Sequence, residues 1–340
     1  MKFWDFKNNV CTGLQIVIIS LLIAGIWGCN NELNVIEEGA TTPIVYGVLS
    51  LQDNNHYIRL ERSFASQSIA ARALAKDTAA LYYPNATVQI QNLSTGAIYN
   101  LTKVDATAEG FPRKTGPFVV SPNWVYKISN DDLNITQSTP YKLIINTGEN
   151  KSLTSTTTTL INPRLISPSP TVKNLVFDFV YKDYKIDWED DANALIHDIN
   201  IKITYEEFNA ANPNQSEIKS LLWKLGESHT KSFINFTPNL FFQYLANNIE
   251  KRQDVVRQMK DIEFQIYSGG KEMLAKQDLV NANFGITGSQ DLPNYSNITG
   301  ALGIFTAKNY LSVGGYYIRQ GAGLDSLFNG SLTKDLNFKQ

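Results

Sequence analysis

The sequence predicts a mostly β protein with two β-sandwich-like domains, the second of which carries helical insertions. Short segments of alternating apolar and polar residues recur along the chain, separated by turns rich in Gly, Asn and Asp, as in antiparallel sheets. The chain has 340 residues, more than one hydrophobic core usually holds, and 43% of them are apolar. Three prolines between 162 and 170 mark a linker between the two halves.

Residues 1–28 are predicted to form a lipoprotein signal peptide. Lys2 and Lys7 precede an apolar run at 14–26, and this run is shorter than the roughly 20 residues that span a bilayer. The segment IWGC at 26–29 resembles a bacterial lipobox, in which the cysteine is lipidated and becomes the first residue of the mature chain. The alternative is an ordinary signal peptide with an incidental cysteine.

The two cysteines limit the chemistry of the mature chain. Cys11 leaves with the signal peptide and Cys29 carries the predicted lipid. No thiol then remains for a disulfide, a cysteine-ligated metal or a cysteine nucleophile. Residues 29–39 are polar and predict a tether, so we expect a chain anchored to a membrane by its lipid and not spanning it.

Charge gives no reason to expect a nucleic-acid partner. The chain holds 30 basic and 32 acidic side chains, a net charge of −2, without a basic stripe that could neutralise phosphates.

The N-terminal domain, residues 40–161, is predicted to be an immunoglobulin-like β-sandwich. The predicted hairpins are 44–51 with 56–64, 86–92 with 97–104, and 141–146 with 152–161. Only the alanine-rich segment 66–81 departs from this pattern, and it fits either a short helix or a crossover.

The C-terminal domain, residues 171–340, follows the linker at 162–170 and is predicted to be β-rich with helices. The predicted strands are 172–180, 184–188, 195–205, 262–267, 301–306 and 314–319. A helix is predicted from Pro238, with an apolar face formed by Phe241, Leu245, Ile249, Val256 and Met259. A shorter helix is predicted at 271–280.

Catalytic motifs are missing from the sequence, so we expect a protein that is not an enzyme and needs no cofactor. His56, His197 and His229 are far apart and have no second ligand at metal-binding spacing. The sequence has no nucleophile elbow and no Walker loop. A hydrolase whose serines or carboxylates converge only in the fold remains an alternative.

One acidic cluster offers weak metal candidates, namely Asp187, Glu189 and Asp191. Their alternating oxygens resemble the start of a calcium loop. Ala192, however, stands where the loop needs Gly, and Asp198 replaces the usual bidentate Glu. A solvated turn is therefore the favoured interpretation, and we predict no metal.

Three tryptophans, Trp124, Trp188 and Trp223, raise the question of sugar stacking. In a sandwich a single Trp more often fills the core, and Trp188 shares a strand face with Tyr184 and Ile186. A core role is favoured, and carbohydrate binding stays open.

Four segments carry a family resemblance. They are YSNITGALGIF at 295–305, IVYGVL at 44–49, YIRLERS at 57–63 and TVQI at 87–90. Together they resemble a Bacteroidota family of outer-membrane lipoproteins of unknown function, usually encoded beside TonB-dependent receptors. The resemblance implies an outer-membrane location, on the periplasmic or the surface face, and a TonB-dependent receptor or a secretion machine as partner. It supplies no catalytic residues.

The expected function is that of a non-catalytic cell-envelope lipoprotein, a binding or accessory subunit of an outer-membrane receptor or of a transport or secretion complex. The alternatives are a surface hydrolase acting on glycans or peptides and a structural component of a surface complex.

Overall fold

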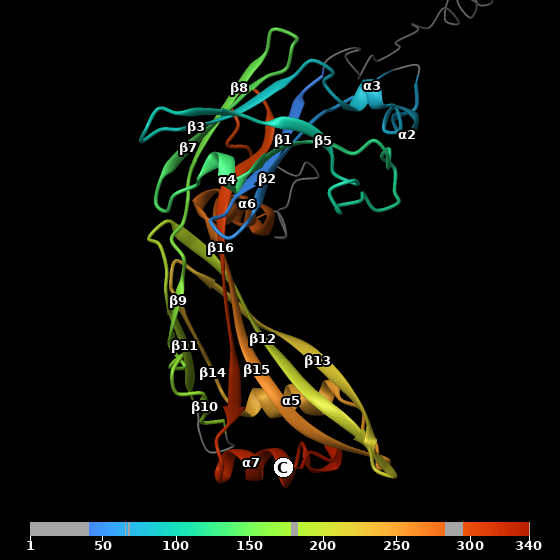
Figure 1. The fold of residues 1–340 in the computed structure, drawn as a ribbon, viewed down its shortest axis with the longest axis vertical. Coiled ribbons are helices and arrows are strands. Elements are labelled where there is room, and N and C mark those ends of the chain that lie inside the picture. The colour runs from blue at the N-terminus through green and yellow to red at the C-terminus, as the bar shows by residue number, and fades with distance from the viewer. Residues whose placement is uncertain (1–40, 65, 67–68, 178–182, 283–294, 340) are drawn as a thin grey trace, which may run out of the picture. The chain divides into compact units, whose positions relative to one another are not determined.

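Strands are the predominant secondary structure of the described residues, as predicted (Figure 1). The computed structural model describes residues 41–64, 66, 69–177, 183–282 and 295–339. The predicted signal peptide, Cys29 and the tether lie outside these residues, as do parts of the predicted segments 66–81 and 172–180.

Sixteen strands are named in the part of the chain that the structure describes. In chain order they are β1 (Pro43–Leu49), β2 (Asn55–Arg62), β3 (Thr87–Asn92), β4 (Ile98–Asn100), β5 (Thr102–Asp105), β6 (Trp124–Ser129), β7 (Pro140–Asn146), β8 (Ser152–Thr158), β9 (Arg164–Ser167), β10 (Asn174–Leu175), β11 (Tyr184–Glu189), β12 (Ala194–Asn209), β13 (Asn212–His229), β14 (Phe233–Phe236), β15 (Val255–Gly270) and β16 (Leu302–Ile318).

The helices are shorter and fewer. They are α2 (Ala71–Leu74), α3 (Thr78–Leu81), α4 (Asn130–Leu133), α5 (Asn239–Asn248), α6 (Lys271–Ala282), α7 (Ala322–Phe328) and the 3-10 helix η1 (Lys334–Leu336). In the segment 66–81, α2 and α3 are each a single turn, and the Asp77 side chain caps α3 by accepting from the Ala79 N–H.

The N-terminal strands form a sandwich. One layer has the order β4-β3-β7-β8, and the other contains β1-β2-β6-β5. Residues alternate between buried and exposed along β1, β2, β3 and β7, so that each strand sends one row of side chains into the space between the layers. Val45, Ile58, Ile90 and Leu143 meet there in one apolar cluster.

The C-terminal strands form a second layered core. The long strands β13, β12, β15 and β16 lie side by side (Figure 1), and a smaller sheet of order β14-β11-β9 contributes to the same cluster together with α5. Ile201, Phe264 and Tyr316 from the long sheet pack there with Trp188 and Phe241. Two sandwich-like units with helical insertions in the second therefore match the predicted fold class, while the domain boundary at 162–170 stays a prediction.

Strand β16 connects these two cores. Its first residues pair in parallel with β1, from Ile44 opposite Leu302 to Leu49 opposite Ala307, and its later residues pair antiparallel with β15. Phe305 is consequently buried in the N-terminal cluster and Ile318 in the C-terminal cluster. The chain thereby forms a continuous sheet of order β13-β12-β15-β16-β1-β2-β6-β5.

Gly303 permits the close approach of β1 to β16. It lies opposite Val45 at a φ of +123°, and a Cβ placed there would overlap the backbone carbonyl of Val45. Asn297 secures the same stretch, because its side-chain amide donates to the Phe305 carbonyl at 2.7 Å and its oxygen accepts from the Phe305 N–H at 2.9 Å. The YSNI segment therefore has a structural role in holding the start of β16.

The helix predicted from Pro238 is shorter than expected. α5 ends at Asn248, and Val256 and Met259, which were predicted to continue its apolar face, lie in β15. Ile249 leaves the helix in an extended conformation, and the long pairing of β15 with β12 determines the structure of the residues from Val255 onward. Helical spacing at 256 and 259 was coincidental.

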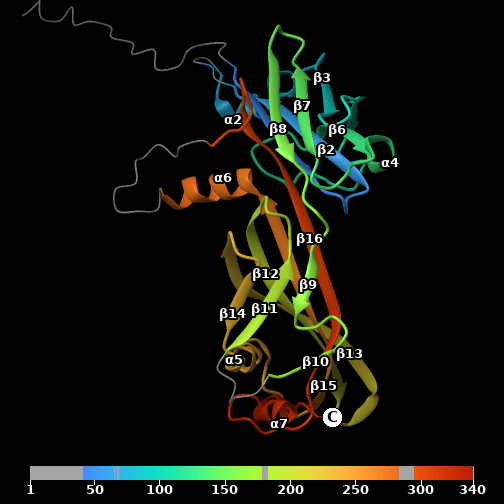
Figure 2. The ribbon, with the colours of Figure 1, turned by 90° about the vertical axis from the view of Figure 1, so that its left-hand side faces the viewer.

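Further boundaries differ from the prediction, among them that of the strand predicted at 97–104, which is divided into β4, paired with β3, and β5, paired with β6. The strands predicted at 301–306 and 314–319 are one strand, β16, because the polar residues Lys308 and Asn309 interrupt the apolar pattern without interrupting the pairing. The predicted linker at 162–170 contains β9, which pairs with β11. α6 forms over the predicted range 271–280 and packs near β12, β15 and β16 (Figure 2).

A buried ion pair closes one end of the C-terminal core. Arg257 is 1% exposed and contacts the Glu207 carboxylate at 2.8 Å, while its other N–H groups donate to the carbonyls of Leu336 and Glu250. These hydrogen bonds satisfy a guanidinium that would otherwise be costly to bury. They also tie the C-terminal residues to β15.

We expect Gly303→Ala to destabilise the fold strongly. The added methyl group would collide with the Val45 backbone and separate β1 from β16. The expected loss in the free energy of unfolding exceeds about 2 kcal/mol, measured by urea denaturation. The matched control is Gly96→Ala, whose φ of +79° is also positive but whose added Cβ would meet nothing within 4 Å. Gly96→Ala should lower the free energy of unfolding by about 1–2 kcal/mol, the cost of a side chain at a positive φ. Equal losses in the two variants would contradict the steric explanation.

Candidate functional site

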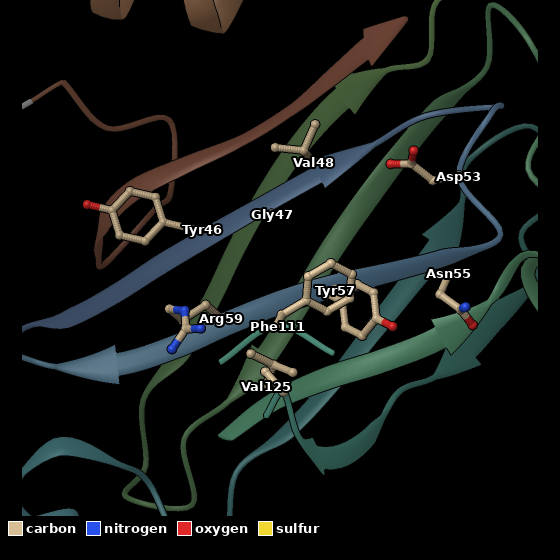
Figure 3. A pocket seen from close by; sticks show the side chains of 10 residues that line it. Tyr46, Gly47, Val48, Asp53, Asn55, Tyr57, Arg59, Phe111 and Val125 are labelled. Atoms are coloured by element: carbon tan, nitrogen blue, oxygen red, sulfur yellow. The ribbon is translucent and has the colours of Figure 1, made fainter. Parts of the chain in front are cut away.

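An aromatic-lined hollow lies on the outer face of β1, β2 and β6, the face turned away from the N-terminal core. Its volume is about 340 Å³. Figure 3 shows Tyr46 and Val48 from β1, Asn55, Tyr57 and Arg59 from β2, Val125 from β6, and Asp53 and Phe111 from the adjoining loops around it.

Strand alternation places these side chains on one face. Tyr46 lies opposite Arg59 in the β1–β2 register, and the neighbouring residues Val45 and Ile58 face the core. Gly47 also faces inward, where a Cβ would crowd the side chains of Ile58 and Phe305. The residues that anchor the sheet and the residues that line the hollow therefore alternate along the same two strands.

Phe111 is the aromatic residue that closes the hollow on the side of β6. Its N–H donates to the Ala106 carbonyl at 2.8 Å, and its own carbonyl accepts from the Asn123 side chain at 3.1 Å. The Phe111 ring meets the Tyr57 ring edge to face with 5.4 Å between centroids. Phe111 is nevertheless 59% exposed and Tyr46 is 45% exposed, so large apolar surface remains open to solvent.

The charged groups around the hollow are paired. Arg59 donates to Glu61 at 2.9 Å and to Asn123 at 2.7 Å. The Tyr57 hydroxyl donates to Glu109, and burial together with that carboxylate raises the pKa of Tyr57. An apolar centre with Tyr and Arg and a charge-compensated rim is the composition of an interface core.

A buried polar cluster lies in the C-terminal half, formed by Asp190, His197, Ser268 and Asn309. His197 Nδ1 lies 2.8 Å from Ser268 Oγ, which donates to Asp190 at 2.6 Å. The Asn309 amide donates to the same carboxylate at 2.6 Å and to the Ile161 carbonyl at 2.9 Å. The side chains of Asp190 and His197 are both 0% exposed. The cluster links the segment near 161 to three strands.

These residue types are those of a hydrolase triad, but their geometry is different. In a triad the imidazole bridges the nucleophile and the carboxylate through its two nitrogens. Here Ser268 and Asp190 both lie on the Nδ1 side of His197, and Nε2 is buried without a hydrogen-bond partner. Ser268 donates its proton directly to Asp190, so the imidazole is not placed to accept it.

Sequence reasoning did not identify this cluster. Asp190 lies in the same acidic segment as the metal candidates Asp187, Glu189 and Asp191. It was not chosen, because the calcium-loop pattern takes every second residue. Its hydrogen-bond partners Ser268 and Asn309 come from distant strands, with sequence separations of 78 and 119. No local pattern signals such a contact.

The three weak metal candidates have different partners. Asp187 pairs with Lys185 at 2.6 Å, and Glu189 pairs with Arg164 at 2.7 Å. Asp191 accepts from Ser138 at 2.8 Å and from the Asn193 side chain at 2.8 Å. Within the described ranges, no group of three or more His, Cys, Asp or Glu side chains is arranged to hold a metal ion.

The tryptophans differ in environment. Trp188 is 1% exposed in the C-terminal core, and Trp223 packs at the edge of the same cluster. Trp124 is half-buried beneath the ammonium group of Lys103, at 5.4 Å from its ring. The favoured core role fits Trp188 best.

The membrane anchor predicted at Cys29 lies outside the described residues. Among the helices that the structure describes, none combines the length and the apolar character needed to cross a bilayer.

Comparisons with known proteins add little. No family model matches the chain, and no curated protein matches it. Among solved structures, the DIP-gamma IG1+IG2 structure is 11% identical over 68% of this chain and 91% of its own, with a TM-score of 0.17. The Dpr2 Ig1-Ig2 complex with DIP-Theta Ig1-Ig3 is 11% identical over 69% of this chain and 76% of its own, with a TM-score of 0.18. Such low TM-scores support no argument about function.

We expect the fold to lose stability as the pH falls below about 6.5, the ordinary pKa of histidine. Burial lowers the pKa of His197 by more than Asp190 raises it, so the unfolded chain takes up a proton that the folded chain resists. The His197 contribution is thus present above the unfolded pKa and is lost as the pH falls. The measurement is urea unfolding at pH 7.5 and pH 5.5 for the wild type and His197→Asn.

The His197→Asn variant should show a smaller difference between the two pH values than the wild type. The control is His229→Asn, since this ring is 38% exposed at the end of β13. A pH difference unchanged in His197→Asn, or reduced equally in His229→Asn, would contradict the assignment.

Proposed function

We propose that the chain is a non-catalytic lipoprotein of the cell envelope, anchored at the outer membrane through Cys29, that binds a protein partner through the hollow around Tyr46, Tyr57 and Phe111. It acts as a binding or accessory subunit. The observation that supports this most is the hollow itself, which combines exposed aromatic rings with paired charges.

The hollow fits a protein partner for physical reasons. Tyr46 and Phe111 can bury large apolar areas on association. Before binding, the Tyr46 backbone is held by the pairing of β1 with β2 and the Phe111 backbone by its hydrogen bonds, which lowers the entropic cost. Glu61 accepts from both Arg59 and Arg113, so an incoming apolar side chain meets a guanidinium that already has a carboxylate partner. Aromatic residues and Arg are enriched among residues that dominate binding energy.

The partner that we propose is an outer-membrane receptor of the TonB-dependent class or a related transport or secretion complex. The motivation is the family resemblance at 295–305 and 44–49 together with the lipobox at 26–29. The hydrolase alternative gains no support from Asp190, His197 and Ser268, because their geometry does not activate the serine. The hollow on the N-terminal sheet has one carboxylate among its lining residues, Asp53, which pairs with Lys308 at 3.0 Å.

Replacing Cys29 by Ala should release the chain from membranes or leave an uncleaved precursor. The lipid is attached to the thiol, and a mature chain without it keeps no hydrophobic anchor. Cell fractionation and the mass of the purified chain measure this. Cys11→Ala is the matched control and should leave anchoring unchanged. A Cys29→Ala chain that is processed to the mature length and stays in the membrane fraction would remove the lipid anchor from the proposal.

The hollow is tested by affinity purification of the full-length tagged lipoprotein from gently solubilised envelopes, followed by mass spectrometry. We expect an outer-membrane barrel protein to co-purify. Phe111→Ala should weaken its binding about 30-fold, as expected for loss of an aromatic anchor worth about 2 kcal/mol. Phe118→Ala is the matched control, because Phe118 is 40% exposed and packs against Arg113 away from the hollow. Equal recovery with Phe111→Ala and wild type would refute the docking site.

A further inference from the structure

A second hollow lies in the C-terminal half, between β13, β14 and α5, and the proposed function does not use it. Its volume is about 520 Å³, within the range of small-molecule sites. Its lining combines Trp223, Leu225, Ile234, Phe236, Leu240 and Tyr244 with Asn235, Thr237, Gln243 and Asn247.

One face of α5 forms a wall of this hollow. Leu240, Gln243, Tyr244 and Asn247 are spaced three and four residues apart and therefore lie on one side of the helix. The other side carries Phe241, Phe242 and Leu245, all fully buried in the core. The buried face fixes the helix, and the opposite face is left free for contact.

Aromatic packing fixes the floor of the hollow. The Trp223 ring stacks on the Tyr244 ring with centroids 5.4 Å apart and planes inclined by 18°, and it meets the Phe236 ring edge to face at 5.6 Å. The Tyr244 hydroxyl donates to the Leu222 carbonyl at 3.0 Å. Neither ring can turn without breaking these contacts, so the aromatic surface is preorganised.

The polar groups at the rim are all uncharged. Asn235, Gln243 and Asn247 offer amide groups that both donate and accept, and Thr237 offers a hydroxyl; all four side chains are exposed. A ligand charge would find no opposite charge among the lining side chains and would lose hydration without compensation. The lining therefore suits a neutral ligand with many hydroxyl groups.

We propose that this hollow binds a neutral oligosaccharide. A pyranose ring has an apolar C–H face that packs on aromatic surface, here the partly exposed Tyr244 ring, which Trp223, itself only 9% exposed, supports from behind, and it has equatorial hydroxyls that both donate and accept. The amides of Gln243 and Asn247, one turn apart on α5, match such hydroxyls. The site is separate from the hollow of Tyr46 and Phe111, so the oligosaccharide proposal does not depend on the protein partner proposed for that hollow.

The experiment titrates the purified full-length lipoprotein with maltohexaose, cellohexaose, xylohexaose, mannohexaose and chitohexaose, and with hexagalacturonate as an anionic probe. Calorimetry gives the affinity, and tryptophan fluorescence, to which Trp124 and Trp188 contribute besides Trp223, is recorded alongside. We expect saturable binding of at least one neutral hexasaccharide with a fluorescence change. Gln243→Ala and Asn247→Ala should each weaken that binding about 5-fold, the usual effect of one lost hydrogen bond.

Tyr244→Ala should abolish binding, and its fold is checked by thermal unfolding. Gln215→Ala is the matched control, since Gln215 is an exposed amide on β13 outside the hollow, and it should bind like the wild type. The proposal is overturned if no neutral oligosaccharide binds, if only hexagalacturonate binds, or if Gln243→Ala and Asn247→Ala keep full affinity. A negative titration would leave the result of the affinity purification with Phe111→Ala unchanged, so the two experiments test the two proposals separately.

Discussion

The parallel pairing of β1 with β16 is the constraint on which the other parts of the structure depend. Without it, the strands β2, β6 and β5 would have no connection to β15 and β12 in one sheet. The pairing needs a residue without a side chain at 303, since the Val45 carbonyl occupies the place of a Cβ. It also needs the Asn297 amide, which satisfies both backbone groups of Phe305 on the side where no strand lies. A single strand then supplies apolar side chains to two separate cores.

The same alternation that builds the cores also produces the surfaces available for binding. On β1 and β2 most inward residues are aliphatic, and the outward residues include Tyr46, Tyr57 and Arg59. On α5 the inward residues are Phe241, Phe242 and Leu245. In both places the buried side chains of an element hold its exposed side chains in position. Charged groups near the exposed side chains are paired, or are missing from the lining. Rigid aromatic surfaces result, with paired charges in the first hollow and none in the lining of the second, and these favour binding through shape and apolar contact over long-range electrostatic attraction.

The sequence predicts the fold class and many of the elements, because periodicity and turn residues are local signals. The hairpin predicted at 44–51 and 56–64 matches β1 and β2, and the helix predicted at 271–280 matches most of α6. The prediction failed where pairing overrides the pattern. β13 was missed because its solvent-exposed residues from Asn212 to Ile218 give no alternation. Val256 and Met259 were assigned to a helix because their spacing fits one, although β12 holds them in a strand.

The sites were less predictable than the fold. Trp223 was noted as a candidate for sugar stacking, but its partner Tyr244 and the amides of α5 come from a segment that was described only by its apolar face. Phe111 lies in a loop without any pattern, and its position depends on Asn123 and Ala106. Asp190 was not predicted, because the alternating ligands of a calcium loop pointed to Glu189 and Asp191 instead. These contacts follow from the tertiary fold and not from a periodic pattern, so a single sequence contains no direct signal of them.

The position of β16 near the end of the chain has a consequence for the order of assembly. Residue 44 must find residue 302, so the N-terminal sandwich lacks the strand that carries Phe305 until most of the polypeptide has emerged. Contacts over such sequence distances slow folding, because the entropic cost of closing the loop precedes the contacts that stabilise the closed state. Until β16 arrives, β1 therefore lacks its parallel partner, and the apolar residues that Phe305 covers in the finished sandwich stay accessible. Closure of the N-terminal sandwich thus depends on a strand that lies far from it in sequence.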